Sequence, residues 1–426
     1  MRTRNRIVLA LILWASALAA SGGNASAADT SASGGANSAM EARFQQLEDV
    51  IAQQQNEILA LRDEVTADSR HDQAAFDLPD VASGILRDTS FHAFGNWGYG
   101  NTNHRNDYSV GETDGGYDNF SGGLNFIMRP HEKMRIQGQI EGHQDEVELE
   151  WLFAEWHFSD LLRARGGRSK HAMGIYGEIH DIGTLRPFFT LPTSVYGPNG
   201  LVGENYDGIG ASGRVEIAPS WNVSYDVYGG QIHLEEESPL EALEEEEGEE
   251  GHGLTAKNLI GGRLVLDTPV EGLSVGSSAY WAQIKGHDGT RDHLVWGFQA
   301  EYLTEDISIR SEYYHHTENN ELTSDSVYVE GAYRFLEKFQ LAGRWEWANE
   351  DVEGSGGLPN SLTEHQEIAL GLNYWFTPNL VVKTSYHHIW GNRFAFPGGE
   401  MLEAALDSGN LRRNTDMVVT GLQFAF

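Results

Sequence analysis

The chain has 426 residues and no cysteine, so disulfide scaffolds, thiolate metal sites and cysteine nucleophiles are excluded. Its 63 acidic residues against 29 basic ones give a formal charge of −34, which excludes binding of nucleic acid through net charge. The 49 glycines and the 11% of aromatic residues favour many short strands over helices. Beyond the N-terminus, no run reaches the ~18–20 apolar residues of a membrane-spanning helix.

Residues 1–27 have the pattern of a secretory signal peptide. Three arginines precede an apolar run over residues 7–20, and Ala-Ser-Ala at 25–27 supplies a small-residue cleavage site. The alternative is an uncleaved anchor helix, for which the apolar run is short. We therefore expect the mature chain to begin near Ala28, after secretion.

A short helix is predicted over residues 40–68, after a flexible leader at 28–39. Its apolar residues follow alternating steps of four and three, which is the a/d pattern of a coiled coil. The positions expected to hold subunits together are Phe44, Leu47, Ile51, Ile58, Leu61 and Val65. Because so short a helix is marginal alone, we predict a periplasmic oligomerisation stalk, or alternatively an amphipathic helix packed on its own domain. Residues 69–88 are predicted to be a linker.

The remainder, residues 89–426, is predicted to be all-β, a transmembrane antiparallel β-barrel of about 16 strands. Short connections of turn-forming residues alternate with mostly longer ones. Short turns on one rim and long loops on the other are typical of bacterial outer-membrane barrels, whereas a propeller or a double sandwich does not require them. The predicted strands are 90–100, 121–130, 134–143, 147–158, 162–170, 207–217, 221–233, 255–267, 273–286, 292–303, 307–319, 324–335, 339–351, 365–376, 380–392 and 414–426.

The last strand shows how the two faces of the barrel are expected to differ, because side chains alternate along a strand. Gly421 and Gln423 are assigned to the channel side. The residues assigned to the lipid side are Val418, Leu422, Phe424 and Phe426. Closure of a barrel requires this strand to pair with 90–100, and the terminal Phe426 is a candidate signal for the barrel insertion machinery.

The inward faces carry charges of both signs. The predicted inward basic residues are Arg135, Arg163, Arg165, Arg214, Arg263, Arg310, Arg334, Arg344 and Lys383, and the acidic ones are Glu141, Glu216, Glu301, Glu312, Glu330, Glu346 and Glu367. Charges of both signs around a pore sieve solutes by size and dipole, whereas a ring of one sign selects ions. Alternatively, these residues pair along the wall and keep it rigid.

The densest basic patch, 162–170, leads into the longest loop, 171–206. This loop is rich in Phe, Tyr, Leu and Pro, so it must be packed, and loops of this length are uncommon unless functional. We predict that it folds into the barrel and narrows the pore; the alternative is packing over a neighbouring subunit. The predicted lumen and constriction residues are Arg163, Arg165, Arg168, Glu178, Asp181, Arg186, Arg135, Arg214, Arg344 and Glu346.

A second loop, 234–253, is strongly acidic: ten Glu lie between Glu235 and Glu250, flanked by His233 and His252. It is predicted to be a solvated external loop. The alternative is a cation trap at the pore mouth that holds divalent ions loosely. The adjacent histidine pairs at 315–316 and 387–388 point to opposite faces of a strand, so neither pair forms a chelate alone and no structural metal is predicted.

The run from 163 to 197, RARGGRSKHAMGIYGEIHDIGTLRPFFTLPTSVYG, resembles the strand and inward-folded loop of Gram-negative outer-membrane porins. With the signal peptide, the coiled coil, sixteen strands and a terminal Phe, the chain resembles the phosphate- or dicarboxylate-selective porin group. The resemblance implies a trimer in outer-membrane lipid that lets small hydrophilic solutes or ions diffuse passively. It also implies that Arg163, Arg165 and Arg186 attract anions. The inward Glu and the acidic loops depart from that pattern.

Two other classes of function stay open at this point. One is an external receptor or adhesin, and the other is a barrel enzyme with a nucleophile and a His on adjacent strands. The GxGxxG at 208–213 lacks a following helix, so it does not indicate a dinucleotide site, and no cofactor is predicted.

Overall fold

The computed structural model describes residues 89–426, apart from 104–105, 107, 109, 111–114, 144–145, 198–200, 235–253, 287–288, 320–321, 353–359 and 396–411. All of the described residues belong to the second of two compact units, Pro79–Phe426. The predicted signal peptide, leader, coiled-coil helix and linker lie outside the described residues, and so does the acidic loop from 235 onward. Those assignments stay predictions.

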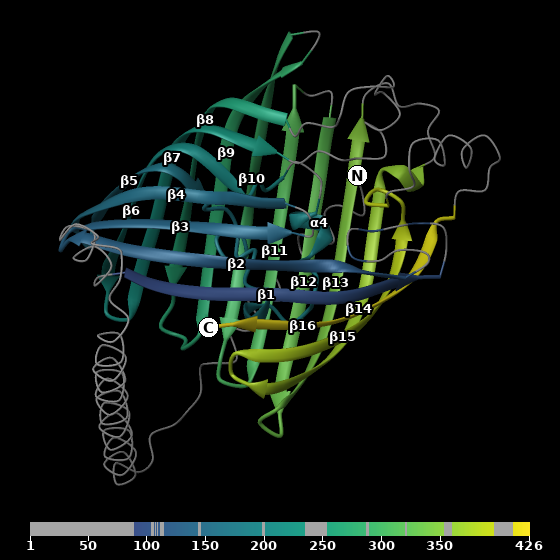
Figure 1. Cartoon of the computed structure of the whole chain (residues 1–426). Helices are drawn as coiled ribbons and strands as arrows, with labels where there is room; N and C mark the ends of the chain where they lie inside the picture. The colour runs from purple at the N-terminus through teal and green to yellow at the C-terminus, as the bar shows by residue number, and fades with distance from the viewer. Residues whose placement is uncertain are drawn as a thin grey trace, which may run out of the picture. The chain divides into compact units, whose positions relative to one another are not determined.

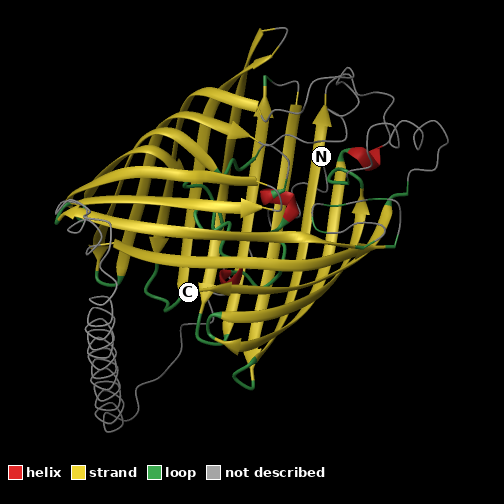
Figure 2. Cartoon of the chain, in the orientation of Figure 1, coloured by secondary structure: helices red, strands yellow, loops and turns green. Residues whose placement is uncertain are grey.

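Sixteen strands make up most of the described chain (Figure 2). They are β1 (Thr89–Thr102), β2 (Gly116–His131), β3 (Met134–His143), β4 (Glu146–Ser159), β5 (Leu162–Lys170), β6 (Asn205–Ala218), β7 (Trp221–Leu234), β8 (Leu254–Asp267), β9 (Leu273–Gly286), β10 (Gly289–Leu303), β11 (Ile307–Glu318), β12 (Leu322–Phe335), β13 (Phe339–Val352), β14 (Glu364–Thr377), β15 (Leu380–Gly391) and β16 (Asn414–Ala425). The helical pieces in the described ranges are η2 (Gly183–Leu185), α4 (Thr193–Tyr196) and η4 (Asn360–Leu362). None of these described helices is long and apolar enough to cross a membrane.

The strands form one closed barrel, in which each strand pairs antiparallel with its neighbours in sequence and β1 pairs with β16 (Figure 1). The register at the closing seam places Trp97 opposite Leu422 and Gly98 opposite Gly421. Closure leaves no strand edge unpaired, so every strand satisfies its backbone groups within the sheet. The predicted antiparallel barrel of about 16 strands is confirmed, and so is the predicted pairing of the first and last strands.

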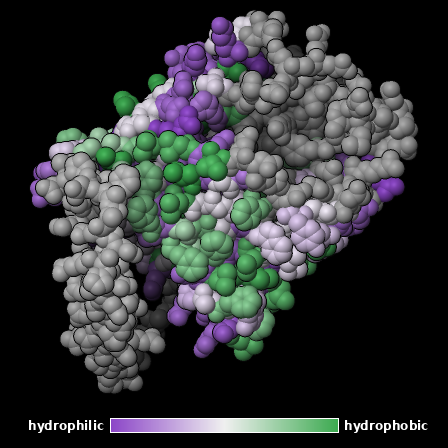
Figure 3. Space-filling view, in the orientation of Figure 1, coloured by the Kyte–Doolittle hydropathy of each residue, from purple (hydrophilic) through white to green (hydrophobic). Residues whose placement is uncertain are grey.

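Apolar residues cover the outer face of the barrel. Along β14, exposed Ile368, Leu370 and Leu372 alternate with buried residues. Comparable side chains on other strands include Ile209 and Ile260, which are 73% and 68% exposed. Figure 3 shows hydrophobic residues over much of the visible wall. A surface of this kind is unfavourable in water and is expected in lipid.

The seam shows why particular residues are needed at the junction of the two chain ends. On the outside, the ring of Phe424 lies over Gly95, where a Cβ would come within 2.5 Å of the ring. On the inside, Gln423 donates a hydrogen bond of 2.8 Å to Asn96. These positions match the lipid and channel sides predicted for the last strand. The terminal Phe426 is 64% exposed, and its backbone pairs with Ala93.

The two rims of the barrel differ in the length of their connections. On one, called here the turn rim, the connections run from two residues (219–220) to five (268–272). The other, called the loop rim, carries the longest connections, including 171–204 and 235–253. The segment 171–204, called here the lumen loop, leaves the loop rim and enters the barrel.

Candidate functional site

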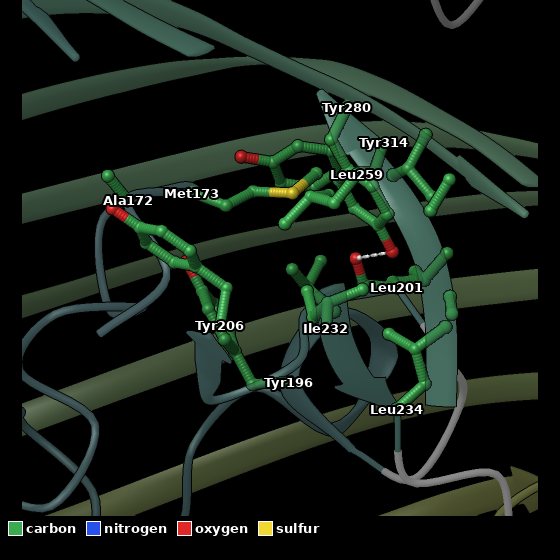
Figure 4. Packing of buried hydrophobic residues seen from close by; sticks show 14 of the residues in the cluster. Ala172, Met173, Tyr196, Leu201, Tyr206, Ile232, Leu234, Leu259, Tyr280 and Tyr314 are labelled. Carbon is green, nitrogen blue, oxygen red and sulfur yellow. Dashed lines mark hydrogen bonds between the residues drawn. The ribbon is translucent and has the colours of Figure 1, made fainter. Parts of the chain in front are cut away.

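The lumen loop packs against the inner wall through the apolar residues that made it unusual in sequence. Met173, Tyr176 and Val195 are at most 1% exposed and belong to a large buried cluster with Tyr206 and Tyr280 from the wall. Figure 4 shows Met173, Tyr206 and Tyr280 of this cluster, with Leu201 near the end of the loop beside Tyr280. Burial of this apolar surface is the main reason the loop stays inside the barrel.

Acidic residues of the wall hold the loop at fixed points. Glu312 accepts hydrogen bonds from the Tyr196 hydroxyl at 2.6 Å and from the backbone N–H of Ile175 at 2.9 Å. Glu346 accepts a bond of 2.7 Å from the backbone N–H of Ser194, at the start of α4. These bonds satisfy loop groups that would otherwise be buried without partners.

Basic residues of the same wall donate to carbonyl oxygens of the loop. Lys383 Nζ lies 2.7 Å from the Gly183 oxygen, 2.6 Å from the Arg186 oxygen and 3.3 Å from the Phe188 oxygen. Arg344 donates to the Thr190 oxygen at 3.0 Å. We call β11–β15 the anchored wall, because its inward charges are used to hold the loop.

Arg344 and Glu346, two predicted constriction residues, therefore lie behind the loop. Their side chains are 1% and 0% exposed and form an ion pair with a separation of 2.9 Å. Arg344 also lies 3.3 Å from Glu367. The alternative interpretation of the inward charges, that they pair and keep the wall rigid, describes this side of the lumen.

A second ionic network ties the loop to the wall formed by β5, β7 and β8. Arg165 lies 3.8 Å from both Glu178 and Asp226, and Arg263 lies 3.0 Å from Asp226 and also pairs with Glu178. Burial alone would raise the pKa of the Glu178 carboxyl, but Arg263 and Arg165 hold it below its usual range. The charges of Arg165 and Glu178 are therefore largely neutralised by each other and their neighbours.

A cavity of about 480 Å³ is left between the loop and β1–β4, which we call the open wall. Its carboxylates come from both sides. Glu141 and Glu150 belong to the open wall, and Asp181 and Glu204, the last residue of the loop, belong to the lumen loop. Arg186 also lines it. With four carboxylates in its lining, the cavity is predominantly acidic.

The acidic groups of the cavity are joined through His180 and Lys170. His180 Nδ1 lies 3.1 Å from a Glu204 oxygen and 3.4 Å from Asp181, which Lys170 contacts at 2.7 Å. Burial would raise the pKa of the Asp181 carboxyl, but the hydrogen bond with His180 and the charge of Lys170 hold it well below its usual range. Burial would lower the pKa of His180, but Glu204 and Asp181 outweigh this and raise it above 6.5.

The third loop residue predicted for the constriction, Arg186, does reach the cavity. Its guanidinium donates to the His180 backbone oxygen at 2.7 Å. Burial lowers its pKa to about 10, against the opposing effect of Tyr176 and Asp181. Arg186 is thus a cation held inside an acidic surrounding.

Four predicted lumen residues do not line the cavity. Arg135 pairs with Glu155 at 2.7 Å, and Arg214 pairs with Asp267 at 2.7 Å. Arg163 sits opposite Ser212 near the turn rim. The predicted assignment of Arg168 to the lumen is wrong. Arg168 stands beside exposed Leu152 in the register and pairs with Asp207 on the outer face of the barrel.

Sequence reasoning missed Glu150, Glu204 and Lys170 as neighbours of Asp181. Glu150 is the extra residue at a register shift in the pairing of β3 with β4, which breaks the alternation used to assign faces. Glu204 is the last residue of the lumen loop, and Lys170, the last residue of β5, directly precedes the loop. The signal that could have indicated them is that the ends of one loop must lie on adjacent strands.

Several groups in the described ranges bring three His or acidic residues close enough to share a metal ion. Two of them line the cavity: Glu141 with His143 and Glu150, and His180 with Asp181 and Glu204. Lys170 already occupies Asp181 in the second group.

No protein-family model matches the chain, and neither does any curated protein compared by sequence. Among solved structures, the anion-selective porin from Comamonas acidovorans is similar over 79% of this chain and 99% of its own, with a TM-score of 0.50 and 10% identity. The outer membrane channel DcaP of Acinetobacter baumannii is similar over 79% of this chain and 97% of its own, again with a TM-score of 0.50 and 10% identity. At this identity the likeness shows a shared barrel fold.

Proposed function

We propose that this protein is a channel in the outer membrane of a Gram-negative bacterium, through which small hydrophilic solutes or ions diffuse passively, with a preference for cations. The observation that carries the proposal is the acidic cavity between the lumen loop and the open wall, inside a closed barrel with an apolar exterior. A barrel of sixteen strands is wide enough for an aqueous channel.

The preference for cations follows from which charges are free to act on a solute. The basic residues of the anchored wall donate to the loop and are buried, whereas the partly exposed Glu150 and Glu204 line the cavity. A negative lining raises the local concentration of cations and lowers that of anions. The resemblance to anion-selective porins would instead favour anions through Arg163, Arg165 and Arg186. Of these three, Arg165 is paired in the ionic network and Arg186 lies among carboxylates.

Conductance across a planar lipid bilayer tests the proposal. The purified full chain should form open channels, and in a salt gradient the reversal potential should have the cation sign. A reversal potential of the anion sign would overturn the cation preference and restore the basic residues as selectivity determinants. Absence of conductance would overturn the channel and favour a receptor or adhesin.

We also propose a homotrimer with a periplasmic N-terminus. Its support is the a/d pattern at Phe44, Leu47, Ile51, Ile58, Leu61 and Val65, together with the resemblance of the sequence to the phosphate- or dicarboxylate-selective porin group, which implies a trimer. Deletion of residues 40–65 should weaken the trimer in mild detergent. An unchanged oligomer would show that the barrels associate without the stalk.

One arrangement of side chains resembles the site that the alternative of a barrel enzyme requires. Ser385 Oγ lies 2.7 Å from His387 Nε2, and His387 Nδ1 lies 2.7 Å from Glu367, the order of a Ser-His-acid triad. All three are at most 4% exposed, on the anchored wall, and Ser385 does not line the cavity. Mutual satisfaction of buried polar groups accounts for these bonds. A fluorophosphonate probe should leave Ser385 unlabelled, whereas labelling lost in S385A would establish a hydrolase.

A further inference from the structure

Three side chains meet inside the barrel near the loop rim, away from the acidic cavity. His293 of β10 pairs in register with Glu318 of β11, and His316 lies two residues before Glu318 on the same inward face. One ligand atom from each lies within 4.8 Å of the others. The three residues are 0%, 2% and 4% exposed.

The hydrogen bonds of Tyr280 fix the tautomer of His293. The Tyr280 hydroxyl donates to the backbone oxygen of Leu201 at 3.1 Å, the dashed line in Figure 4. It therefore accepts from His293 Nε2, which lies 2.9 Å away, so the proton of this imidazole is on Nε2. Nδ1 of His293 then presents a lone pair to His316 Nε2, at 3.1 Å.

Glu318 completes a set of three ligands. Its Oε1 lies 2.7 Å from Arg291, while Oε2 lies 3.8 Å from His293 Nδ1. Arg291 thus orients the carboxylate through one oxygen and leaves the other toward the imidazoles. Outer groups such as Tyr280 and Arg291 are the usual means by which proteins aim metal ligands.

A second inward group shows what an unsuitable site looks like. Glu346, His365 and Glu367 also bring three ligand atoms together. However, the Arg344 guanidinium lies 2.9 Å from Glu346 and 3.3 Å from Glu367, so both carboxylates are already paired with a cationic side chain. In the group formed by His293, His316 and Glu318, by contrast, Arg291 is 42% exposed and contacts Oε1 of Glu318, which leaves Oε2 toward the imidazoles.

We propose that His293, His316 and Glu318 bind a divalent transition metal, with zinc as the best match. Two imidazole nitrogens and one carboxylate oxygen are a common zinc ligand set, and water takes the fourth position. Tetrahedral zinc with bonds of ~2.0–2.1 Å requires nitrogens about 3.3 Å apart, close to the separation already present.

Binding requires a change of tautomer at one residue. The proton on His316 Nε2 moves to Nδ1, which has no hydrogen-bond partner in the part of the chain that the structure describes. The metal would join β10 to β11 and, through Tyr280, to Leu201 at the end of the lumen loop. No structural metal was predicted from the sequence, because His293 and His316 lie on neighbouring strands and meet only when the barrel forms.

Zinc binding by the full-length protein tests the site. After chelation and dialysis, the wild-type protein should bind one more equivalent of Zn²⁺ than the double variant H293A/H316A. The matched control is H315A, because His315 is adjacent in sequence but bonds Asp325 at 2.8 Å from the other face of β11. Counting the difference separates this site from any Zn²⁺ held by the acidic loop.

Two further measurements keep the test decisive. E318Q retains the size of the side chain and should abolish the visible absorption of four-coordinate Co²⁺, while Y280F should weaken binding about tenfold. Equal Zn²⁺ content in wild type and H293A/H316A, or an equal loss in H315A, would overturn the site. If H293A/H316A does not fold, an unchanged Co²⁺ spectrum in E318Q overturns it equally.

Discussion

The two sides of the lumen use the same residue types for different purposes. On the anchored wall, Arg344 and Glu346 are 1% and 0% exposed and bond to the lumen loop. Beside the open wall, His180 and Glu204 keep 26% and 33% of their side chains exposed toward the cavity. A buried charge must be fully paired, whereas a partly exposed one keeps a field that a solute can sense. Burial therefore decides which charges act on a solute.

Removing an anchor should have the largest consequence for this contrast. In K383M, three loop oxygens lose their donor, and we expect the free energy of unfolding to fall by about 3 kcal/mol. Single-channel conductance should rise and become noisier as the loop leaves its position. Urea unfolding in lipid vesicles and bilayer recordings measure the two effects.

The matched control for K383M is K338M, on an exposed turn at the turn rim. It makes the same substitution without removing a loop contact and should behave as wild type. Equal stability and equal conductance in the two variants would show that the anchored wall does not hold the loop.

Charge reversal beside the open wall should change selectivity more than it changes stability. E204K alters two units of charge in the cavity, which is worth about 1 kcal/mol to a passing ion at an effective dielectric constant between water and protein. The permeability ratio of cations to anions should fall about fivefold, measured from the reversal potential in a KCl gradient. E305K, on an exposed turn, is the control; an equal shift in both would place selectivity outside the cavity.

The features that could be predicted from the sequence are those that depend on local alternation along a strand. Strand number, closure and lipid-facing residues such as Leu370 were predictable, because alternation is local and lipid imposes it on every strand. Parity along β5 would also have placed Arg168 outside, since Arg163 and Arg165 point inward.

The acidic cavity was not predictable in the same way. Glu204 and Asp181 meet only because of the path that the lumen loop takes, and Glu150 lies at a register shift of β4. Likewise, nothing in the sequence distinguished Glu346, which anchors α4, from an acidic residue open to solutes. Three-dimensional burial separates them, and local periodicity carries no information about it.

The charge on His180 should make selectivity depend on pH. Its pKa is raised above 6.5, so the imidazolium persists to higher pH than usual and offsets the cavity carboxylates. As pH rises through the raised pKa this positive charge is lost, and the preference for cations should increase about twofold. By the same sign, the stability contributed by the ion pair with Glu204 is present below pH 6.5 and is lost as pH rises through the pKa.

The pH step can be assigned with two variants. H180Q should remove it, while H143Q tests the other imidazole that lines the cavity. Reversal potentials measured from pH 6 to pH 9 would contradict the assignment if H180Q kept the step and H143Q abolished it.

The smallest change in selectivity is expected from a charge on the outer face of the barrel. This test asks whether the position of each charge or the summed charge of the basic patch decides selectivity. Arg163 and Arg168 belong to the same basic patch, but Arg163 is inward near the turn rim and Arg168 pairs with Asp207 outside, with 44% of its side chain exposed. R168Q should leave the reversal potential unchanged and alter stability by no more than about 0.5 kcal/mol, because exposed ion pairs contribute little. R163Q should shift the reversal potential further toward cations. If R168Q changed selectivity as much as R163Q, the basic patch would act through its summed charge, and burial and facing would not decide which charges a solute meets.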